Sequence, residues 1–211
     1  IKLGMRQGAA FDDSNLNGAF WCPVSIGTRK DGSKVFFPHL IADRTKPGLI
    51  AVDGNAQRFV NESRSYHEFV QQMIPAQGPF HLICDHAFAM RFPFGITRPV
   101  PFSTARHEQN GYLLSGRTLE ELAGKMGVDP KALCNTVERF NADARWGHDQ
   151  DFGRGSTIYQ RNLGDAANRP SPSLAPILKP PFHAIRIYPG DIGTIHGLRA
   201  DADSRVLDTD G

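Results

Sequence analysis

The sequence predicts an α+β fold, with a small mixed or antiparallel sheet and flanking helices. Two observations support this prediction: short β-prone runs separated by Asp-Gly and Pro/Gly turns, and two helices with complete start and stop signals. The chain has 211 residues, of which 40% are hydrophobic, and this is enough apolar material for one large domain with extensions.

The stretch from Gly48 to Met73 organises the rest of the chain. Leu49–Val52 and Arg58–Val60 are short β-prone runs, and Asp53-Gly54 lies between them. Asp-Gly is a strong signal for a type I′ hairpin turn, because this turn needs positive φ angles that glycine tolerates. We therefore expect a strand, a tight turn and a second strand.

A helix is predicted directly after this hairpin. The apolar positions then follow the spacing i, i+3, i+4 and i+7, which marks one face of a helix, and they are Tyr66, Phe69, Val70 and Met73. Ser63 or Ser65 can cap the N-terminus. A tyrosine therefore lies in or near the first helical turn.

This position gives Tyr66 two possible roles. A phenol is a weak acid, but the N-terminal end of a helix favours negative charge, so Tyr66 can be a proton acceptor. Alternatively, it is an amphipathic core residue whose hydroxyl reaches the surface.

The remaining segments form a scaffold and two irregular stretches. Thr118 with Glu121 opens one helix, and Asp129-Pro130 opens a second that runs to about Trp146. Residues 88–102 contain three prolines and four phenylalanines, so they form an irregular apolar segment that either lines a pocket or packs on itself. Residues 147–181 form a long irregular stretch.

Composition excludes several functions. The net charge is +2 and there is no basic run, so we expect no nucleic-acid partner. No apolar run approaches the ~20 residues that span a bilayer. Three widely spaced cysteines fit a reducing compartment, and hence a cytoplasmic location. His81, Cys84 and His86 match no standard zinc spacing, so no metal site is expected.

Motifs for nucleotide binding and hydrolysis are missing from the sequence. It contains no G-x-G-x-x-G, no P-loop and no G-x-S-x-G. Both ends look cut, because the chain begins without Met and ends at Asp210-Gly211 within a turn-like run. We therefore expect a fragment of a longer protein.

Three segments carry a family resemblance. They read RFVNES followed by a tyrosine, GRTLEELAGKMGVDPKALCNTVERFNADARWGHDQDFGRGSTIYQR, and SPSLAPILKPPFHAIRIYPGDIGT-x-x-GL. Together they resemble the flavin-dependent 3-ketosteroid Δ1-dehydrogenases, within a wider group that includes the soluble fumarate reductases.

The resemblance implies a substrate-binding (cap) domain at residues 35–188. Residues 1–34 would lead in from a split FAD-binding domain, and residues 189–211 would return to it. It also implies FAD in the full-length protein, an apolar ring-ketone substrate and an electron acceptor that the sequence does not identify. By itself, this stretch would be a binding or lid domain without activity.

The same resemblance assigns candidate site residues. Tyr66 would be the base that takes a proton next to the ketone, at a place where the fumarate reductases carry an arginine. Arg64 lies nearby and leaves open a fumarate reductase or succinate dehydrogenase-like enzyme that acts on a carboxylate. Phe94, Val100 and Ile192 would contact the substrate.

The turn G-T-I-H-G at residues 193–197 resembles the family's G-T-x-G-G, which approaches the flavin. Thr194, His196 and Gly197 are therefore the candidate flavin contacts. His196 replaces a glycine, so its side chain would crowd the flavin, hydrogen-bond to it or point away.

Overall fold

A computed structural model of the chain describes residues 1–15, 17–41, 43–99 and 101–210. The chain divides into a terminal unit, made of residues 1–21 and 191–211, and a central unit, made of residues 22–190. This division places residues 22–34 with the central unit, whereas the sequence prediction grouped them with the first segment.

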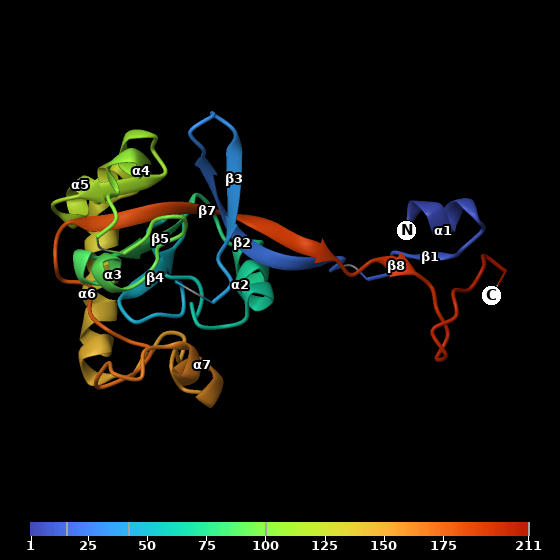
Figure 1. The fold of residues 1–211 in the computed structure, drawn as a ribbon. Helices are drawn as coiled ribbons and strands as arrows, with labels where there is room; N and C mark the ends of the chain where they lie inside the picture. The colour runs from blue at the N-terminus through green and yellow to red at the C-terminus, as the bar shows by residue number, and fades with distance from the viewer. Residues whose placement is uncertain (16, 42, 100, 211) are drawn as a thin grey trace. The chain divides into compact units, whose positions relative to one another are not determined.

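The central unit is built on an antiparallel sheet, as the α+β prediction required (Figure 1). Among the described residues the strand order is β3-β2-β7-β5-β4, with β6 also paired to β7. The strands are β2 (Ala19–Thr28), β3 (Lys34–Pro38), β4 (Leu49–Val52), β5 (Phe80–Cys84), β6 (Leu113–Gly116) and β7 (Phe182–Thr194). β5 pairs antiparallel with β4 on one side and with β7 on the other.

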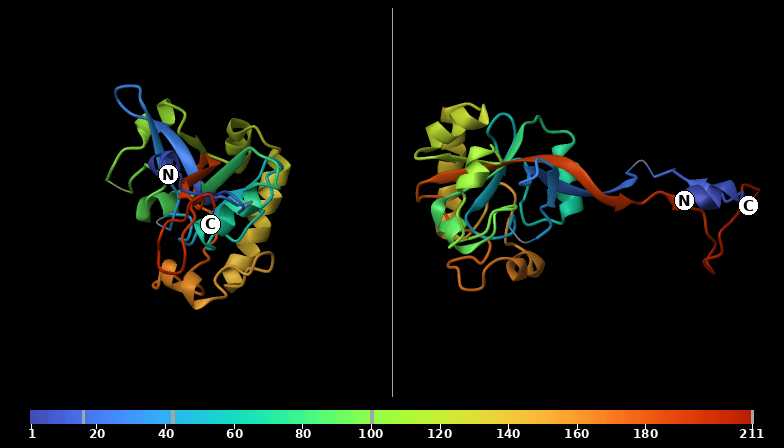
Figure 2. Two further views of the ribbon diagram at one scale, coloured as in Figure 1. Left: turned by 90° about the vertical axis from the view of Figure 1, so that its right-hand side faces the viewer. Right: turned by 45° about the horizontal axis from the view of Figure 1, so that its top comes forward.

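Helices accompany this sheet. They are α2 (Tyr66–Met73), α3 (His86–Arg91), α4 (Ala105–Gln109), α5 (Leu119–Met126), α6 (Pro130–Trp146) and α7 (Ile158–Leu163). Figure 2 shows α6, drawn in gold, at the edge of the central unit in both views. The main apolar cluster joins α5 and α6 to one face of the sheet through residues such as Ile50, Ile83 and Ala184. Every residue of β4 and β5 is buried, so both faces of these strands are covered.

The signals for α5 and α6 are confirmed. Thr118 Oγ1 accepts a hydrogen bond from the backbone N–H of Glu121, and Asp129 caps α6 with Pro130 as its first residue. Gly147 ends α6 in the left-handed conformation, at a φ of 75°. Local side chain-to-backbone hydrogen bonds therefore set these boundaries.

The predicted hairpin at residues 49–60 is wrong in its second half. In the described part of the chain, residues 53–60 form no second strand, and a single isolated bridge joins Val52 to Arg58. The positive φ angle of 58° belongs to Ala56, and Gly54 does not have one. Gly54 is needed for a different reason: its added Cβ would lie 2.4 Å from the carbonyl oxygen of Gly78. A close approach of two backbone segments, and not a type I′ turn, explains this glycine.

Two irregular stretches contain more regular structure than predicted. Residues 88–91 form the end of α3, and α7 lies within residues 147–181. β7 directly follows the second stretch and runs for 13 residues, from Phe182 to Thr194. The prolines lie outside α3, which explains why the apolar segment begins as a helix.

The terminal unit is a short helix and a two-stranded ribbon. α1 spans Lys2–Arg6, and β1 (Phe11–Asp12) pairs antiparallel with β8 (Gly197–Leu198). Across the described ranges of the whole chain, no helix combines the length and apolar character needed to cross a bilayer. Nor does any group of three or more His, Cys, Asp or Glu side chains in those ranges have a geometry suited to a metal ion.

Candidate active-site loop at the start of helix α2

Tyr66 is the first residue of α2. The preceding residue, Ser65, forms a capping box with Glu68: the Ser65 hydroxyl accepts the Glu68 N–H at 3.2 Å, and the Glu68 carboxylate accepts the Ser65 N–H at 3.3 Å. The Tyr66 side chain is half-buried. Within the described residues, no hydrogen bond of its hydroxyl is found. A tyrosine with an available hydroxyl therefore stands at the positive end of a helix.

Residues 61–65, here called the Tyr66 loop, are anchored by a buried carboxylate. Glu62 is 0% exposed, and its Oε1 accepts the backbone N–H of Ala51 in β4 at 3.0 Å. Arg58 donates to both Glu62 oxygens, through Nε at 2.9 Å and Nη2 at 2.8 Å. This two-point contact fixes the carboxylate in orientation as well as in position.

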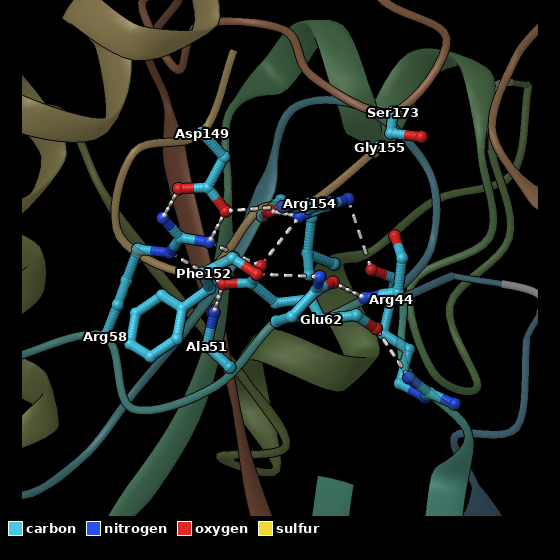
Figure 3. Close-up of polar contacts among 12 residues, drawn as sticks. Arg44, Ala51, Arg58, Glu62, Asp149, Phe152, Arg154, Gly155 and Ser173 are labelled. Carbon is cyan, nitrogen blue, oxygen red and sulfur yellow. Dashed lines mark hydrogen bonds and ion pairs between the residues drawn. The ribbon is translucent and has the colours of Figure 1, made fainter. Parts of the chain in front are cut away.

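Two further groups complete this cluster (Figure 3). Asp149 receives Arg58 Nη1 at 2.8 Å and Nη2 at 3.0 Å, and Arg154 Nη1 donates to Glu62 Oε2 at 3.1 Å. Arg154 also donates to backbone carbonyls, including that of Leu49 at 2.6 Å. The guanidinium groups are thus bonded to carboxylates and to the backbone, which satisfies charges that would otherwise be costly to bury.

Arg44 supports the Tyr66 loop directly. Its Nη1 donates to the carbonyl oxygens of Glu62 and Arg64, each at 2.5 Å. Its guanidinium also lies 5.3 Å from the ring centroid of Phe69, the fourth residue of α2. One side chain therefore holds both the loop before Tyr66 and the helix after it.

The electrostatics of the cluster keep its carboxylates charged. Burial by itself would raise the pKa of Glu62, but Arg58 and Arg154 outweigh it, so the pKa lies below its ordinary value. Burial likewise opposes ionisation of Asp149, and its hydrogen bonds with Arg58 lower the pKa. Burial lowers the pKa of Arg44 to about 10, which still leaves it cationic at neutral pH.

A polar cleft opens beside the Tyr66 loop. Its volume is about 410 Å³, and it is lined by Phe59, Val60, Asn61, Arg64, Gln72, Asp151 and Phe152. Arg64 is half-exposed and lies 3.6 Å from the Glu68 carboxylate. The guanidinium groups of Arg44, Arg58 and Arg154 bond to carboxylates or backbone carbonyls, although Arg44 Nη2 and Arg154 Nε have no hydrogen-bond partner among the described residues. None of these three residues lines the cleft.

The predicted substrate contacts lie in different places. Phe94 is only 1% exposed, and its ring packs edge-on against Phe88 at 5.9 Å in the central unit. Ile192 lies near the end of β7 in the terminal unit and is 50% exposed. Val100 falls outside the described residues. Contact with substrate stays a prediction for all three.

The candidate flavin contacts all belong to the terminal unit. Thr194 Oγ1 donates to the Gly18 carbonyl at 3.0 Å and accepts the His196 N–H at 3.1 Å. The His196 ring is bonded through Nε2 to the Asn15 carbonyl at 2.7 Å. A Cβ added to Gly18 would lie 2.2 Å from this ring, so the ring would have to move to accommodate another residue there.

Two glycines in this strip leave room for a flat ligand. A Cβ added at Gly193 or Gly197 would meet nothing within 4 Å. The approach of a flavin to these positions stays a prediction. The sequence has no G-x-G-x-x-G, so this strip contains no pyrophosphate-binding fingerprint.

Sequence reasoning singled out Tyr66 but missed its supports. Arg58 and Glu62 are four residues apart, a spacing that signals a pair only on a helix, and here they lie in a turn. Asp149 is 91 residues from Arg58 in the sequence. The local sequence signal for these residues was weak: they are charged residues within runs that are otherwise apolar or rich in glycine.

Comparisons with known proteins match the whole chain. The family profile described as "FAD binding domain" covers residues 1–211. The chain is 40% identical to 4-oxocyclohex-2-ene-1-carboxylate 5-dehydrogenase of Sinomonas cyclohexanicum, covering 99% of this chain and 36% of that protein. It is 36% identical to 3-oxosteroid 1-dehydrogenase of Mycobacterium tuberculosis, covering 100% of this chain and 38% of that protein.

A solved structure shows the same arrangement. The crystal structure of 3-ketosteroid Δ1-dehydrogenase from Sterolibacterium denitrificans, in complex with 1,4-androstadiene-3,17-dione, superposes with a TM-score of 0.86 at 37% identity. The match covers 100% of this chain and 38% of that one, so the chain spans little more than a third of these relatives. The predicted resemblance is confirmed, and the chain belongs to the FAD-binding domain family of flavoproteins.

Proposed function

We propose that the protein containing this chain is an FAD-dependent dehydrogenase that desaturates a ring ketone, such as a 3-ketosteroid. The relatives support this substrate class, because the names of both curated proteins describe the oxidation of a ring that bears a ketone. In this proposal the central unit is the substrate-binding (cap) domain, and the terminal unit belongs to the FAD-binding domain.

The observation that carries the proposal is Tyr66 on a rigid loop. The reaction removes a proton from the carbon next to the carbonyl and a hydride from the adjacent carbon, which leaves a C=C bond. Tyr66 accepts the proton in its phenolate form and becomes a neutral phenol. Bound FAD supplies the two-electron oxidation that takes up the hydride.

In this proposal, other residues of the chain hold the Tyr66 phenol in place and line the flavin. The Tyr66 loop keeps the phenol in place through Arg44 and Glu62, because a misplaced base loses much of its rate advantage. Gly193, Thr194 and Gly197 would line the flavin in the full-length protein, and the bond from His196 to Asn15 keeps the imidazole engaged elsewhere.

Steady-state turnover of the full-length holoprotein tests this function. A 3-ketosteroid, 4-oxocyclohexanecarboxylate and fumarate would be compared, with an artificial electron acceptor or donor as each requires. We expect turnover of at least one ring ketone and none of fumarate. Turnover of fumarate alone would overturn the proposal in favour of a carboxylate-reducing enzyme.

The role of Tyr66 is tested by Tyr66→Phe, which removes only the hydroxyl. Loss of a general base typically costs about 10²- to 10⁴-fold in rate. We expect a loss of kcat in that range with unchanged flavin absorbance. Tyr159→Phe, at an exposed tyrosine of α7, is the matched control and should keep full activity. A Tyr66→Phe enzyme as active as wild type would exclude Tyr66 as the base.

A further inference from the structure

A second buried cluster lies apart from the Glu62 cluster and joins three distant segments. His39 Nδ1 is 2.7 Å from Asp43 Oδ2, His39 Nε2 is 2.8 Å from Ser25 Oγ, and Ser25 Oγ is 2.7 Å from Tyr112 Oη. Ser25, His39 and Asp43 are 0% exposed and Tyr112 is 6% exposed. The order Ser–His–Asp resembles a hydrolytic triad, but no substrate can reach a fully buried serine, so the cluster needs another explanation.

The donor and acceptor of each hydrogen bond in this cluster can be assigned in sequence, starting from Asp43. The Asp43 carboxylate only accepts, so His39 Nδ1 donates to it and Nε2 is left to accept from Ser25. Ser25 in turn accepts from the Tyr112 hydroxyl, whose burial raises its pKa to about 12. Each of these hydrogens then has an acceptor within the cluster. Burial opposes ionisation of Asp43, but His39 and two backbone N–H groups lower the pKa of its carboxyl below the ordinary value.

Asp43 and Tyr112, the two ends of this hydrogen-bonded cluster, both contact one turn. Asp43 Oδ2 accepts the Gly95 N–H at 2.9 Å, and Tyr112 Oη accepts the Ile96 N–H at 3.1 Å. Gly95 has a φ of 57°, and a Cβ added there would lie 2.0 Å from Tyr112 Oη. The turn at residues 94–97 is therefore built around this cluster.

Asp43 also connects the cluster to the Tyr66 loop. Its Oδ1 accepts the backbone N–H of Arg44 at 2.7 Å, and Arg44 Nε donates to the His39 carbonyl at 2.8 Å. These bonds orient the same Arg44 side chain whose Nη1 holds the carbonyls of Glu62 and Arg64. An unbroken series of hydrogen bonds thus runs from Gly95 through Asp43 and Arg44 to the Tyr66 loop.

We propose that the His39–Asp43 pair is a positioning hub that fixes the Tyr66 loop and the 94–97 turn together. The hub thereby sets the place of the base relative to the apolar segment at residues 88–102. It touches neither substrate nor flavin, so His39 and Asp43 are positioning residues. This inference rests on the proposed function, in which Tyr66 is the base.

Two substitutions at one residue separate positioning from general stability. His39→Asn keeps a donor near the position of Nδ1, so it retains the bond to Asp43 and loses the bond to Ser25. His39→Gln places its amide near the position of Nε2, so it retains Ser25 and loses Asp43. Loss of the partner of a buried carboxylate costs more stability than loss of the partner of a hydroxyl, so kcat is compared at a temperature at which both variants are fully folded.

In the full-length holoprotein, we expect the kcat of His39→Gln to be lower than that of His39→Asn by about 10-fold or more. The reason is that displacing a catalytic group by about 1 Å can lower the rate by about 10²-fold. KM and flavin absorbance should differ little between the two variants. Equal kcat values in the two folded variants would overturn the proposal and reduce the hub to a purely structural role.

Hydrogen exchange tests the hub without activity. In Tyr112→Phe, which removes the acceptor of one turn amide, we expect faster exchange at Ile96 than in wild type, with Tyr188→Phe unchanged as the control. In His39→Gln, we expect faster exchange at the backbone amides of both Gly95 in the 94–97 turn and Ser65 in the Tyr66 loop. Faster exchange confined to Gly95 would refute the link to the Tyr66 loop. If wild type oxidises no ring ketone, the proposed function fails, and these exchange rates still decide whether the hub exists.

Discussion

Replacing Glu62 by glutamine tests whether the buried cluster holds the Tyr66 loop. The substitution preserves the shape of the side chain but removes its charge and turns one acceptor into a donor. The guanidinium group of Arg154, a residue that is only 2% exposed, then loses its only carboxylate partner among the described residues. Breaking a buried ion pair on one side typically costs about 3–5 kcal/mol. Arg58 keeps Asp149, so we expect a cost near the lower end, about 3 kcal/mol.

Urea unfolding of the full-length protein measures this cost. With an m value of about 2–3 kcal/mol/M, a loss of about 3 kcal/mol moves the midpoint down by about 1–1.5 M. Glu138→Gln, at an exposed position of α6, is the matched control and should stay within about 0.5 kcal/mol of wild type. A Glu62→Gln protein that unfolds with the control would refute the reasoning, because the cluster would then contribute nothing to the loop.

Three further outcomes are expected from single residues. The pKa of buried His81 is lowered to about 4, first by burial and then by Arg186, so the unfolded state binds the extra proton between pH ~6.5 and 4. The contribution of His81 to the free energy of unfolding is complete above pH ~6.5. About 3 kcal/mol of it is lost as the pH falls toward 4. Urea unfolding between pH 7 and 4.5 should therefore show a steeper loss for wild type than for His81→Gln, and parallel curves would contradict this. Gly54→Ala should lower the melting temperature, because its Cβ would lie 2.4 Å from a backbone oxygen, and an unchanged melting temperature would disprove that close approach. Gly124→Ala, inside α5 with nothing within 4 Å of its Cβ, should instead stabilise by about 1 kcal/mol; a lower melting temperature would contradict an exposed helical position there.

Local signals in the sequence determined the helices and their boundaries. Capping residues act on backbone groups within three positions. The apolar positions of α6 recur with the period of a helix, and Leu133, Val137, Phe140 and Ala144 all lie in the core. The placement of Tyr66 in the first turn of α2 followed from the same kind of signal. The family resemblance was also readable, because its motifs are continuous segments.

Tertiary structure alone decided what surrounds Tyr66. Neither the pairing of Arg58 with Asp149 nor the bond between Ser25 and Tyr112, which are 87 residues apart, follows from any local period. Burial of these charged and polar side chains is tolerated only when their partners from other segments are in place. The sequence of a single segment therefore does not predict that they are buried. The positive φ angle of Ala56 also differs from the prediction, which placed such an angle at Gly54. Short-range hydrogen bonds therefore specified the elements, and the meeting of distant charged and polar side chains specified the site.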